Sequence, residues 1–246
     1  DAARTIVLGD LVHGGDAASY RRVKALLDRL TMPVSLMIGN HDHRPTFLAA
    51  FPEAQRDAAG FVQAYHDVAT YRLVLADTVL DPPHDLPSDA CGLLCSRRMH
   101  WLERALEAPG GDRVLLFMHH PPMQTGFPGM DAVRLCDGDG LLRVLQRRGN
   151  VRHIFAGHIH RTISGTWHGI PFSIFKSPVH QQPMDLVSPA TDLAVDEHGD
   201  APGGVELQEL RTLKVAAERV DDDGFERDSE LCSAQVVRIE RPEGNS

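Results

Sequence analysis

The stretch Val34-Ser35-Leu36-Met37-Ile38-Gly39-Asn40-His41-Asp42 joins an apolar run to a short polar segment. Such a run is typical of a buried strand, and the glycine after it is typical of a sharp turn. Three other places in the chain also have polar residues directly after an apolar run. These places are Gly9-Asp10, His119-His120-Pro121 and Gly157-His158-Ile159-His160. The sequence therefore predicts polar groups at the ends of several buried strands.

Polar groups at strand ends converge when the strands are roughly parallel, because the loops at their carboxyl ends share one crevice. The groups here are carboxylate, amide oxygen and imidazole, which suit Zn, Mn, Fe or Co. The Asp10 carboxylate has two oxygens and can bridge two ions. Two such ions can clamp a phosphoryl group and generate a hydroxide nucleophile at neutral pH. The segments therefore predict hydrolysis of a phosphate ester.

In this order, the four segments resemble those of the calcineurin-like metallophosphoesterases, over about Arg4 to Ala194. The resemblance implies an α/β (α+β) fold, a four-layer α/β/β/α sandwich of two mixed sheets. Within the superfamily, several segments look similar to bacterial glycerophosphodiesterases and to class III cyclic nucleotide phosphodiesterases. These segments are His119-His120-Pro121-Pro122, Met130-Asp131, Gly157-His158-Ile159-His160, Val179-His180-Gln181 and Ser188-Pro189-Ala190.

The resemblance also implies a ligand set for two divalent transition metal ions, drawn from Fe, Mn, Zn or Co. Asp10 would bridge the two ions, and Asn40, His119 and His158 would complete one site. His160 would belong to the other site.

Four further histidines are candidates for contact with substrate. His41 resembles the family histidine near the phosphate that protonates or stabilises the leaving oxygen, a role that suits imidazoles in general. His120 is expected to orient a ligand or to face the substrate. The resemblance suggests a phosphate contact for His180, and a solvated loop histidine is the alternative. His13 is either near the substrate or a plain loop residue.

One part of the family pattern has no counterpart here. The family has an Asp-x-His pair at the end of its first strand, a few tens of residues before the Gly-Asp segment, whereas Asp10 is the tenth residue of this chain. The first strand, the first helix and two metal ligands are therefore expected to be missing. Either the chain begins late in a longer protein, which we favour, or its second metal site is incomplete.

The expected activity is hydrolysis of a small, glycerophosphodiester-like substrate by in-line attack of a metal-bound hydroxide. Val179-His180-Gln181 favours this substrate over a 3',5'-cyclic nucleotide, which is the first alternative. A metal-poor scaffold of the same fold that binds proteins is the second alternative. The retained histidine and aspartate segments argue against the scaffold.

Composition limits the class of protein and its partners. With 246 residues, 42% hydrophobic and 24% charged, the chain is expected to form one catalytic domain over 1–194 and a C-terminal extension over 195–246. The net charge of −9 argues against a nucleic acid polymer as partner. No apolar run suits a membrane helix and no signal peptide is visible, so a cytoplasmic protein without membrane contact is expected. A homo-oligomer remains an option.

The periodicity of apolar residues predicts alternating helices and strands. Besides the strands before the four segments, it predicts a strand at Tyr71–Ala76, a hairpin of Thr162–His168 with Phe172–Ser177, and a late edge strand or subunit contact at Gln235–Ile239. The predicted helices are Asp16 to about Leu30, Pro45–Phe51, Ser96–Ala108 and Leu141–Arg148, and Leu210–Val220 has helix-forming residues.

Overall fold

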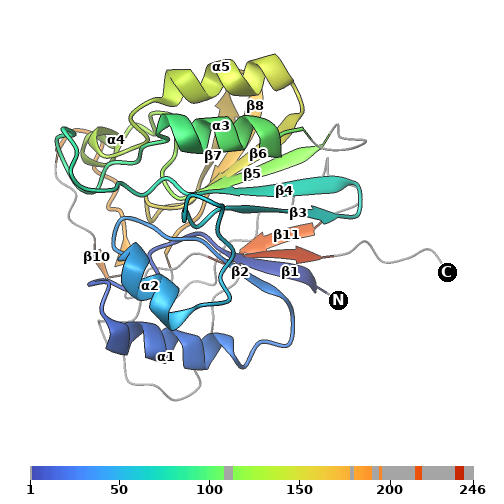
Figure 1. The fold of residues 1–246 in the computed structure, drawn as a ribbon. Helices are drawn as coiled ribbons and strands as arrows, with labels where there is room; N and C mark the ends of the chain where they lie inside the picture. Colours follow the sequence, from blue (N-terminus) through green and yellow to red (C-terminus); the bar gives the residue numbers. More distant parts are fainter. Residues whose placement is uncertain are drawn as a thin grey trace.

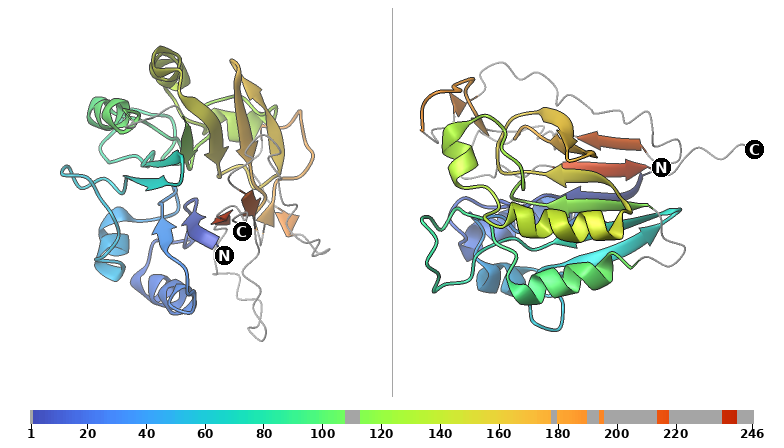
Figure 2. Two further views of the ribbon diagram at one scale, coloured as in Figure 1. Left: turned by 90° about the vertical axis from the view of Figure 1, so that its right-hand side faces the viewer. Right: turned by 90° about the horizontal axis from the view of Figure 1, so that it is seen from above.

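Two β-sheets face each other, and helices cover the outer face of each sheet (Figure 1). This computed structural model describes residues 2–107, 113–177, 180–189, 194–195, 214–217 and 236–240. Figure 2 shows from two further sides that α1 and α2 lie on one side of the sheets and α3 and α5 on the other. The four-layer α/β/β/α arrangement expected from the sequence is confirmed.

The first sheet is mixed and has the strand order β11-β12-β1-β2. It consists of β1 (Ala2–Val7), β2 (Val34–Leu36), β11 (Lys214–Ala217) and β12 (Val236–Glu240). Strands β1 and β2 are parallel, and β12 is antiparallel to both β1 and β11. The parallel pair places the carboxyl ends of β1 and β2 side by side.

The second sheet is also mixed and has the order β3-β4-β5-β6-β8-β7. It consists of β3 (Ala64–Val68), β4 (Tyr71–Ala76), β5 (Val114–Met118), β6 (Val151–Ala156), β7 (Ile163–Trp167) and β8 (Ile170–Ile174). Its four central strands are parallel, and both outer strands are antiparallel to their neighbours. A separate pair is formed by β9 (His180–Gln181) and β10 (Ala194–Val195).

The helices are α1 (Ala17–Leu27), α2 (Arg44–Ala50), α3 (Ser96–Ala105), α4 (Pro128–Ala132) and α5 (Gly138–Arg148). Helix α1 begins where predicted, because the Asp16 side chain accepts hydrogen bonds from the backbone N–H groups of Ala18 and Ser19. It ends at Leu27, one turn earlier than predicted. No helix among the described residues is both long enough and apolar enough to cross a bilayer.

The buried apolar side chains of the described residues form three clusters. Alternate residues of a strand face opposite sides, so Ile6 packs between the sheets while Val7 packs under α1 and α2. Phe117 stacks on Phe155 between the sheets, with ring centroids 4.9 Å apart. The third cluster lies under α3 and α5 and contains Leu116. The two sheets are therefore held face to face mainly by packing of apolar side chains.

The C-terminal segment differs from its prediction. The helix-forming residues around 210–220 include a strand, β11, whose backbone pairs with β12. Such pairing outweighs weak local helix propensity. The late strand is present as β12, but it lies between β11 and β1 rather than at the edge. The division at residue 194 stays a prediction, although both of these strands belong to the sheet of β1.

Candidate metal centre

Four of the predicted ligands meet where the loops after β1, β2, β5 and β6 converge. The Oδ2 atom of Asp10 lies 3.2 Å from the Nε2 atom of His119. The Oδ1 atom of Asn40 lies 3.2 Å from His119 Nε2 and 2.9 Å from His158 Nδ1. Asp10, His119 and His158 are buried. Residues up to 148 positions apart in sequence thus form one cluster, as the strand-end pattern predicted.

The backbone at this cluster takes a rare conformation. Asp10, His158 and His160 have φ angles of 53°, 70° and 55°, in the left-handed region that costs most residues free energy. The glycine at position 9 also has a positive φ, of 100°. Gly39 is needed for another reason, because an added Cβ atom would lie 2.2 Å from Asp10 Oδ1. In the fourth segment the positive φ belongs to the predicted ligand His158, and the glycine before it, Gly157, has no positive φ.

The protonation of His119 shows whether a cation fits this cluster. Its Nδ1 atom contacts the Leu8 carbonyl oxygen at 2.7 Å and must carry the proton, because a carbonyl oxygen only accepts. In the neutral ring, Nε2 is then a lone pair that faces the oxygens of Asp10 and Asn40. Lone pairs from three loops therefore point to one place. A proton or a metal ion must lie among them.

The charges of Asp10 and His119 agree with this reading. Burial by itself lowers the pKa of His119, but the Asp10 carboxylate outweighs burial and raises it. Burial by itself raises the pKa of Asp10, but His119 overrides burial and holds that pKa well below its usual range. Without metal the pair is therefore a carboxylate and an imidazolium. Nitrogen and oxygen donors of this kind suit a divalent transition metal ion, which would take the place of the proton.

His158 is prepared to act as a neutral ligand. Burial, followed by the nearby His119, lowers the pKa of His158 to about 3, so the imidazole is uncharged at neutral pH. Its Nε2 atom is buried and has no hydrogen-bond partner among the described residues. An orphaned imidazole nitrogen of this kind is costly unless something binds it. His160 is buried in the same loop.

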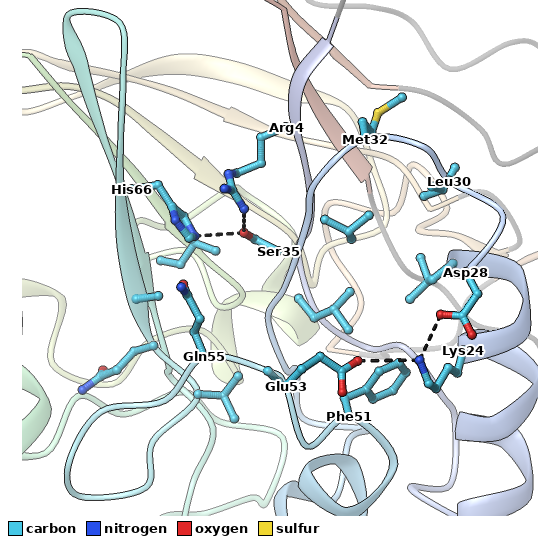
Figure 3. A pocket seen from close by; sticks show the side chains of 18 residues that line it. Arg4, Lys24, Asp28, Leu30, Met32, Ser35, Phe51, Glu53, Gln55 and His66 are labelled. Carbon is cyan, nitrogen blue, oxygen red and sulfur yellow. Dashed lines mark hydrogen bonds and ion pairs between the residues drawn. The ribbon is translucent and has the colours of Figure 1, made fainter.

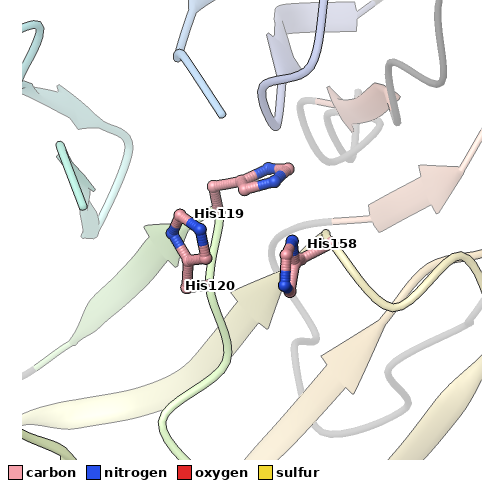
Figure 4. A group of neighbouring side chains, drawn as sticks. All are labelled: His119, His120 and His158. Carbon is pink, nitrogen blue, oxygen red and sulfur yellow. The ribbon is translucent and has the colours of Figure 1, made fainter. Parts of the chain in front are cut away.

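His120 lies beside the predicted ligands, but both of its ring nitrogens contact other groups. The ring nitrogens of His119, His120 and His158 include atoms within 4.8 Å of one another (Figure 4). Both nitrogens of His120 are engaged, however: Nδ1 with the Thr78 hydroxyl at 2.7 Å and Nε2 with the Ala90 carbonyl at 3.1 Å. Burial, followed by His158 and His119, lowers the pKa of His120 well below its usual value. His120 therefore packs against the predicted ligands, with both of its ring nitrogens already engaged.

Asp42 fastens the Asn40 loop to the Asp10 loop. Its carboxylate accepts hydrogen bonds from the Gly39 N–H at 2.8 Å, the Leu11 N–H at 3.2 Å and the Tyr20 hydroxyl at 2.9 Å. Burial and then the Asp10 charge raise the pKa of Asp42 to about 7. This carboxylate therefore holds the two loops together through hydrogen bonds to their backbone N–H groups.

His41 and His13 lie together beside the cluster. The His41 backbone N–H donates to Asp10 Oδ1 at 3.0 Å, which ties the residue to the proposed bridging carboxylate. The His41 Nδ1 atom donates to the His13 carbonyl oxygen at 3.1 Å, and the two rings stack with centroids 4.8 Å apart. Because Nδ1 is the donor, Nε2 is the His41 atom left to exchange a proton. The structure thus brings His13 to His41.

The side chain of His180 lies outside the described residues. The backbone nearby is described: Gln182 N–H donates to the His160 carbonyl oxygen at 3.1 Å. The segment that follows His180 therefore runs beside the His160 loop.

Two residues of the site were missed from the sequence. Thr78 holds the His120 ring, and Tyr20 holds Asp42. A signal existed for Thr78, because it follows the strand Tyr71–Ala76 as closely as the other site residues follow theirs. Tyr20 carried no such signal, since a tyrosine on the apolar face of a helix is usually part of the core.

The chain is similar to known proteins. A family model described as calcineurin-like phosphoesterase matches residues 3–162. A protein of Rhodopseudomonas palustris, named as a probable cyclic nucleotide phosphodiesterase, is 40% identical over 89% of this chain and 76% of its own length. The glycerophosphodiester phosphodiesterase GpdQ of Enterobacter lignolyticus is 31% identical over 72% of this chain. That match covers 63% of the Enterobacter protein, just under two thirds of its length.

A solved structure supports the fold. A dimetal phosphatase from Danio rerio superimposes with a TM-score of 0.53 over 65% of each chain, at 18% sequence identity. At this identity, the likeness concerns the arrangement of strands and helices alone.

Proposed function

Because the chain belongs to the calcineurin-like phosphoesterase family, we propose that it hydrolyses small phosphodiesters at a metal centre built on Asp10, Asn40, His119, His158 and His160. The observation that carries this proposal is the close approach of Asp10 Oδ2 and Asn40 Oδ1 to His119 Nε2, each at 3.2 Å. Carboxylate oxygen, amide oxygen and imidazole nitrogen at one buried place form a donor set that suits a divalent transition metal ion.

The ions and the protein would have different tasks. Bound divalent ions would withdraw charge from the phosphoryl oxygens and lower the pKa of water. The protein fixes the donors: the Leu8 carbonyl orients His119, and Asp42 ties the Gly39 backbone to the Asp10 loop. We propose two ions, with Asp10 shared between them and His160 on the second, and Fe, Mn, Zn or Co as their identity.

His41 would supply the proton to the leaving alcohol. Its Nδ1–H is directed to the His13 carbonyl oxygen, so a proton on Nε2 is the one available for transfer. The backbone hydrogen bond to Asp10 keeps the residue at the metal centre. The oxygen of a water molecule would bond to phosphorus as the P–O bond to the alcohol breaks. The proton from His41 would pass to the departing oxygen, which avoids the release of an alkoxide.

We propose a glycerophosphodiester as the first substrate candidate and a 3',5'-cyclic nucleotide as the second. The segment Val179-His180-Gln181 favours the acyclic substrate, and its continuation runs beside the His160 loop. The name of the Rhodopseudomonas relative favours the cyclic one.

A comparison of kcat/KM for glycerophosphoethanolamine, cyclic AMP and bis(p-nitrophenyl) phosphate, each with added Mn²⁺, tests this order. A higher value for the glycerophosphodiester supports it, and a higher value for cyclic AMP reverses it. Absence of hydrolysis of all three, with Zn²⁺, Co²⁺ and Fe²⁺ also tried, would contradict the proposed function.

A further inference from the structure

A cavity of about 490 Å³ opens beside the edge strand β2, and none of the proposed metal ligands lines it. It extends between α1, the loop after α2, and the edge strands β2 and β3 (Figure 3). A volume of this size is in the range of small-molecule sites. Its wall is mixed, and the apolar part of the wall includes Leu36, Phe51 and Leu75.

One end of the cavity is polar where an apolar layer is expected. Arg4 lies two residues before Ile6, and Ser35 lies two residues before Met37, so both face the layer between the sheets. Arg4 Nη1 donates to Ser35 Oγ at 2.9 Å, and Ser35 Oγ lies 3.0 Å from His66 Nε2 (Figure 3). These three residues, Arg4, Ser35 and His66, are called the polar end below.

The polar end carries a positive charge that no carboxylate among the described residues pairs with directly. Asp67 acts on His66 from nearby, but its carboxylate binds Arg72. Ser35 Oγ accepts from Arg4, so its own proton points to His66 Nε2, and that ring is neutral. Burial, and then the Arg4 charge, lower the pKa of His66 to about 4, in agreement with this. Burial also lowers the pKa of Arg4, and no described carboxylate pairs with it. The net charge of the polar end is therefore +1.

Three other buried or half-buried arginines, Arg44, Arg72 and Arg98, do have acidic partners. Arg72 binds Asp67 through two nitrogens, at 2.7 and 2.9 Å. Arg44 and Arg98 both contact Asp77. Burying a guanidinium is costly unless it is paired, and these three arginines follow that rule. Arg4 departs from it among the described residues, and its Nε atom has no hydrogen-bond partner.

A second polar side chain of the wall, Gln63, has an oxygen without a hydrogen-bond donor among the described residues. Gln63 is 3% exposed, and its Nε2 donates to Asp57 Oδ2 at 2.7 Å. Its Oε1 atom is buried and receives no hydrogen bond from the part of the chain that the structure describes. The opposite end of the cavity has Lys24 with Asp28 and Glu53, where one cation faces two acids. An anionic group would therefore be attracted to Arg4 and repelled from that end.

We propose that this cavity binds an organic anion with an apolar body and one hydrogen-bond donor. The anionic group would pair with Arg4, the body would lie on Leu36, Phe51 and Leu75, and the donor would reach Gln63 Oε1 after a small shift of the wall. Carboxylate, sulfonate and phosphate groups share the chemistry that the polar end recognises.

Titration with 8-anilinonaphthalene-1-sulfonate tests this proposal, because this probe has an anion, an aromatic body and one N–H group. N-phenyl-1-naphthylamine has the same body without the sulfonate. The wild-type protein should bind the sulfonate about 10- to 150-fold more tightly than the neutral probe, since a charged hydrogen bond contributes about 1.5–3 kcal/mol. Arg4→Met should remove this preference and leave the affinity for the neutral probe unchanged.

Arg143→Met is the matched control, because Arg143 is exposed on α5, on the far side of the second sheet. It should bind both probes as the wild type does. Gln63→Met should weaken both probes equally, since both carry the N–H group. Circular dichroism and melting temperature verify that each variant is folded.

Three results would overturn the proposal. The first is unchanged sulfonate binding in folded Arg4→Met protein, and the second is no sulfonate binding by the wild type. The third is binding that disappears as the protein self-associates on concentration, which would mean that a second copy of the chain covers the cavity.

Discussion

The Nε2 atom of His119 lies 3.2 Å from the Oδ2 atom of Asp10, and both side chains are almost completely buried. The proton on His119 Nδ1 is committed to the Leu8 carbonyl oxygen, so the short contact needs a cation between its two atoms. An ion pair of carboxylate and imidazolium satisfies it in the absence of metal. A divalent ion would satisfy it better, because Asn40 and His158 supply further donors at the same place.

Removal of a proposed ligand should reduce the metal content. Asn40→Ala and His119→Ala should each lower metal affinity by at least about tenfold, as is found even when residues that only support a ligand are removed. Inductively coupled plasma mass spectrometry after dialysis measures the content. His100→Ala is the control, because its side chain is 70% exposed on α3, and it should keep the wild-type metal content. Equal metal content in all three variants would refute the ligand set.

His41→Ala should slow turnover while the metal remains bound. General acid catalysis contributes about 10²- to 10⁴-fold, so kcat for an alkyl phosphodiester should fall in that range. A p-nitrophenyl ester depends less on general acid catalysis, because its leaving group is stable as an anion. The loss of kcat for this ester should therefore be smaller. An equal loss for both esters would argue that His41 positions the substrate and does not donate a proton.

Gly39→Ala should disrupt the proposed metal centre by a steric clash. The added Cβ atom would lie 2.2 Å from Asp10 Oδ1 and 2.6 Å from His119 Cε1, so one of these ligands must move. Activity and metal content should both fall strongly. Gly14→Ala is a close comparison, because the Cβ atom added there meets nothing within 4 Å. If the two variants behave alike, the close approach of Gly39 is unimportant.

His153 should make the fold sensitive to acid. Its buried ring stacks on the Phe155 ring, with centroids 4.3 Å apart, and its Nε2 atom lies 3.0 Å from Ser173 Oγ. Burial lowers the pKa of His153 to about 4. The unfolded chain binds a proton near pH 6.5 and the folded chain does not, so the stability contributed by this residue falls as pH drops from 6.5 to 4. Between pH 7.5 and 5 the free energy of unfolding should fall by about 2 kcal/mol because of this residue.

Urea unfolding of wild type and His153→Gln at both pH values measures this loss. The glutamine cannot titrate, so the variant should lose about 2 kcal/mol less than the wild type between the two conditions. Identical losses would show that protonation of His153 does not contribute.

Most of the site could be predicted from the sequence, because each ligand directly follows an apolar strand and strand ends are visible as local patterns. The parallel arrangement then brings Asp10, Asn40, His119 and His158 together. Contacts that depend on three-dimensional packing could not be read in this way. The hydrogen bond from Tyr20 to Asp42 joins a helix to a loop 22 residues away, and no local pattern records it.

The late strands show the same limit for the fold. Residues 214–217 have helix-forming composition, yet they pair with β12. Likewise β3 escaped prediction, because its sequence Ala64–Val68 is polar for a strand and becomes one by pairing with β4 at the edge of the sheet. In both cases a neighbouring strand supplies hydrogen bonds that outweigh local preference. The cavity beside β2 was equally invisible, since it depends on how α1, β2 and β3 are placed.

The central claim is that buried oxygens and nitrogens of four loops hold metal ions that the reaction requires. The most direct measurement is hydrolysis of bis(p-nitrophenyl) phosphate by the purified chain before chelation, after removal of metal with EDTA, and after addition of Mn²⁺, Zn²⁺, Co²⁺ or Fe²⁺ in separate reactions. Our account predicts that chelation abolishes hydrolysis and that at least one of these ions restores it, with metal bound in proportion to activity. Hydrolysis that persists in protein shown to be free of metal would contradict it.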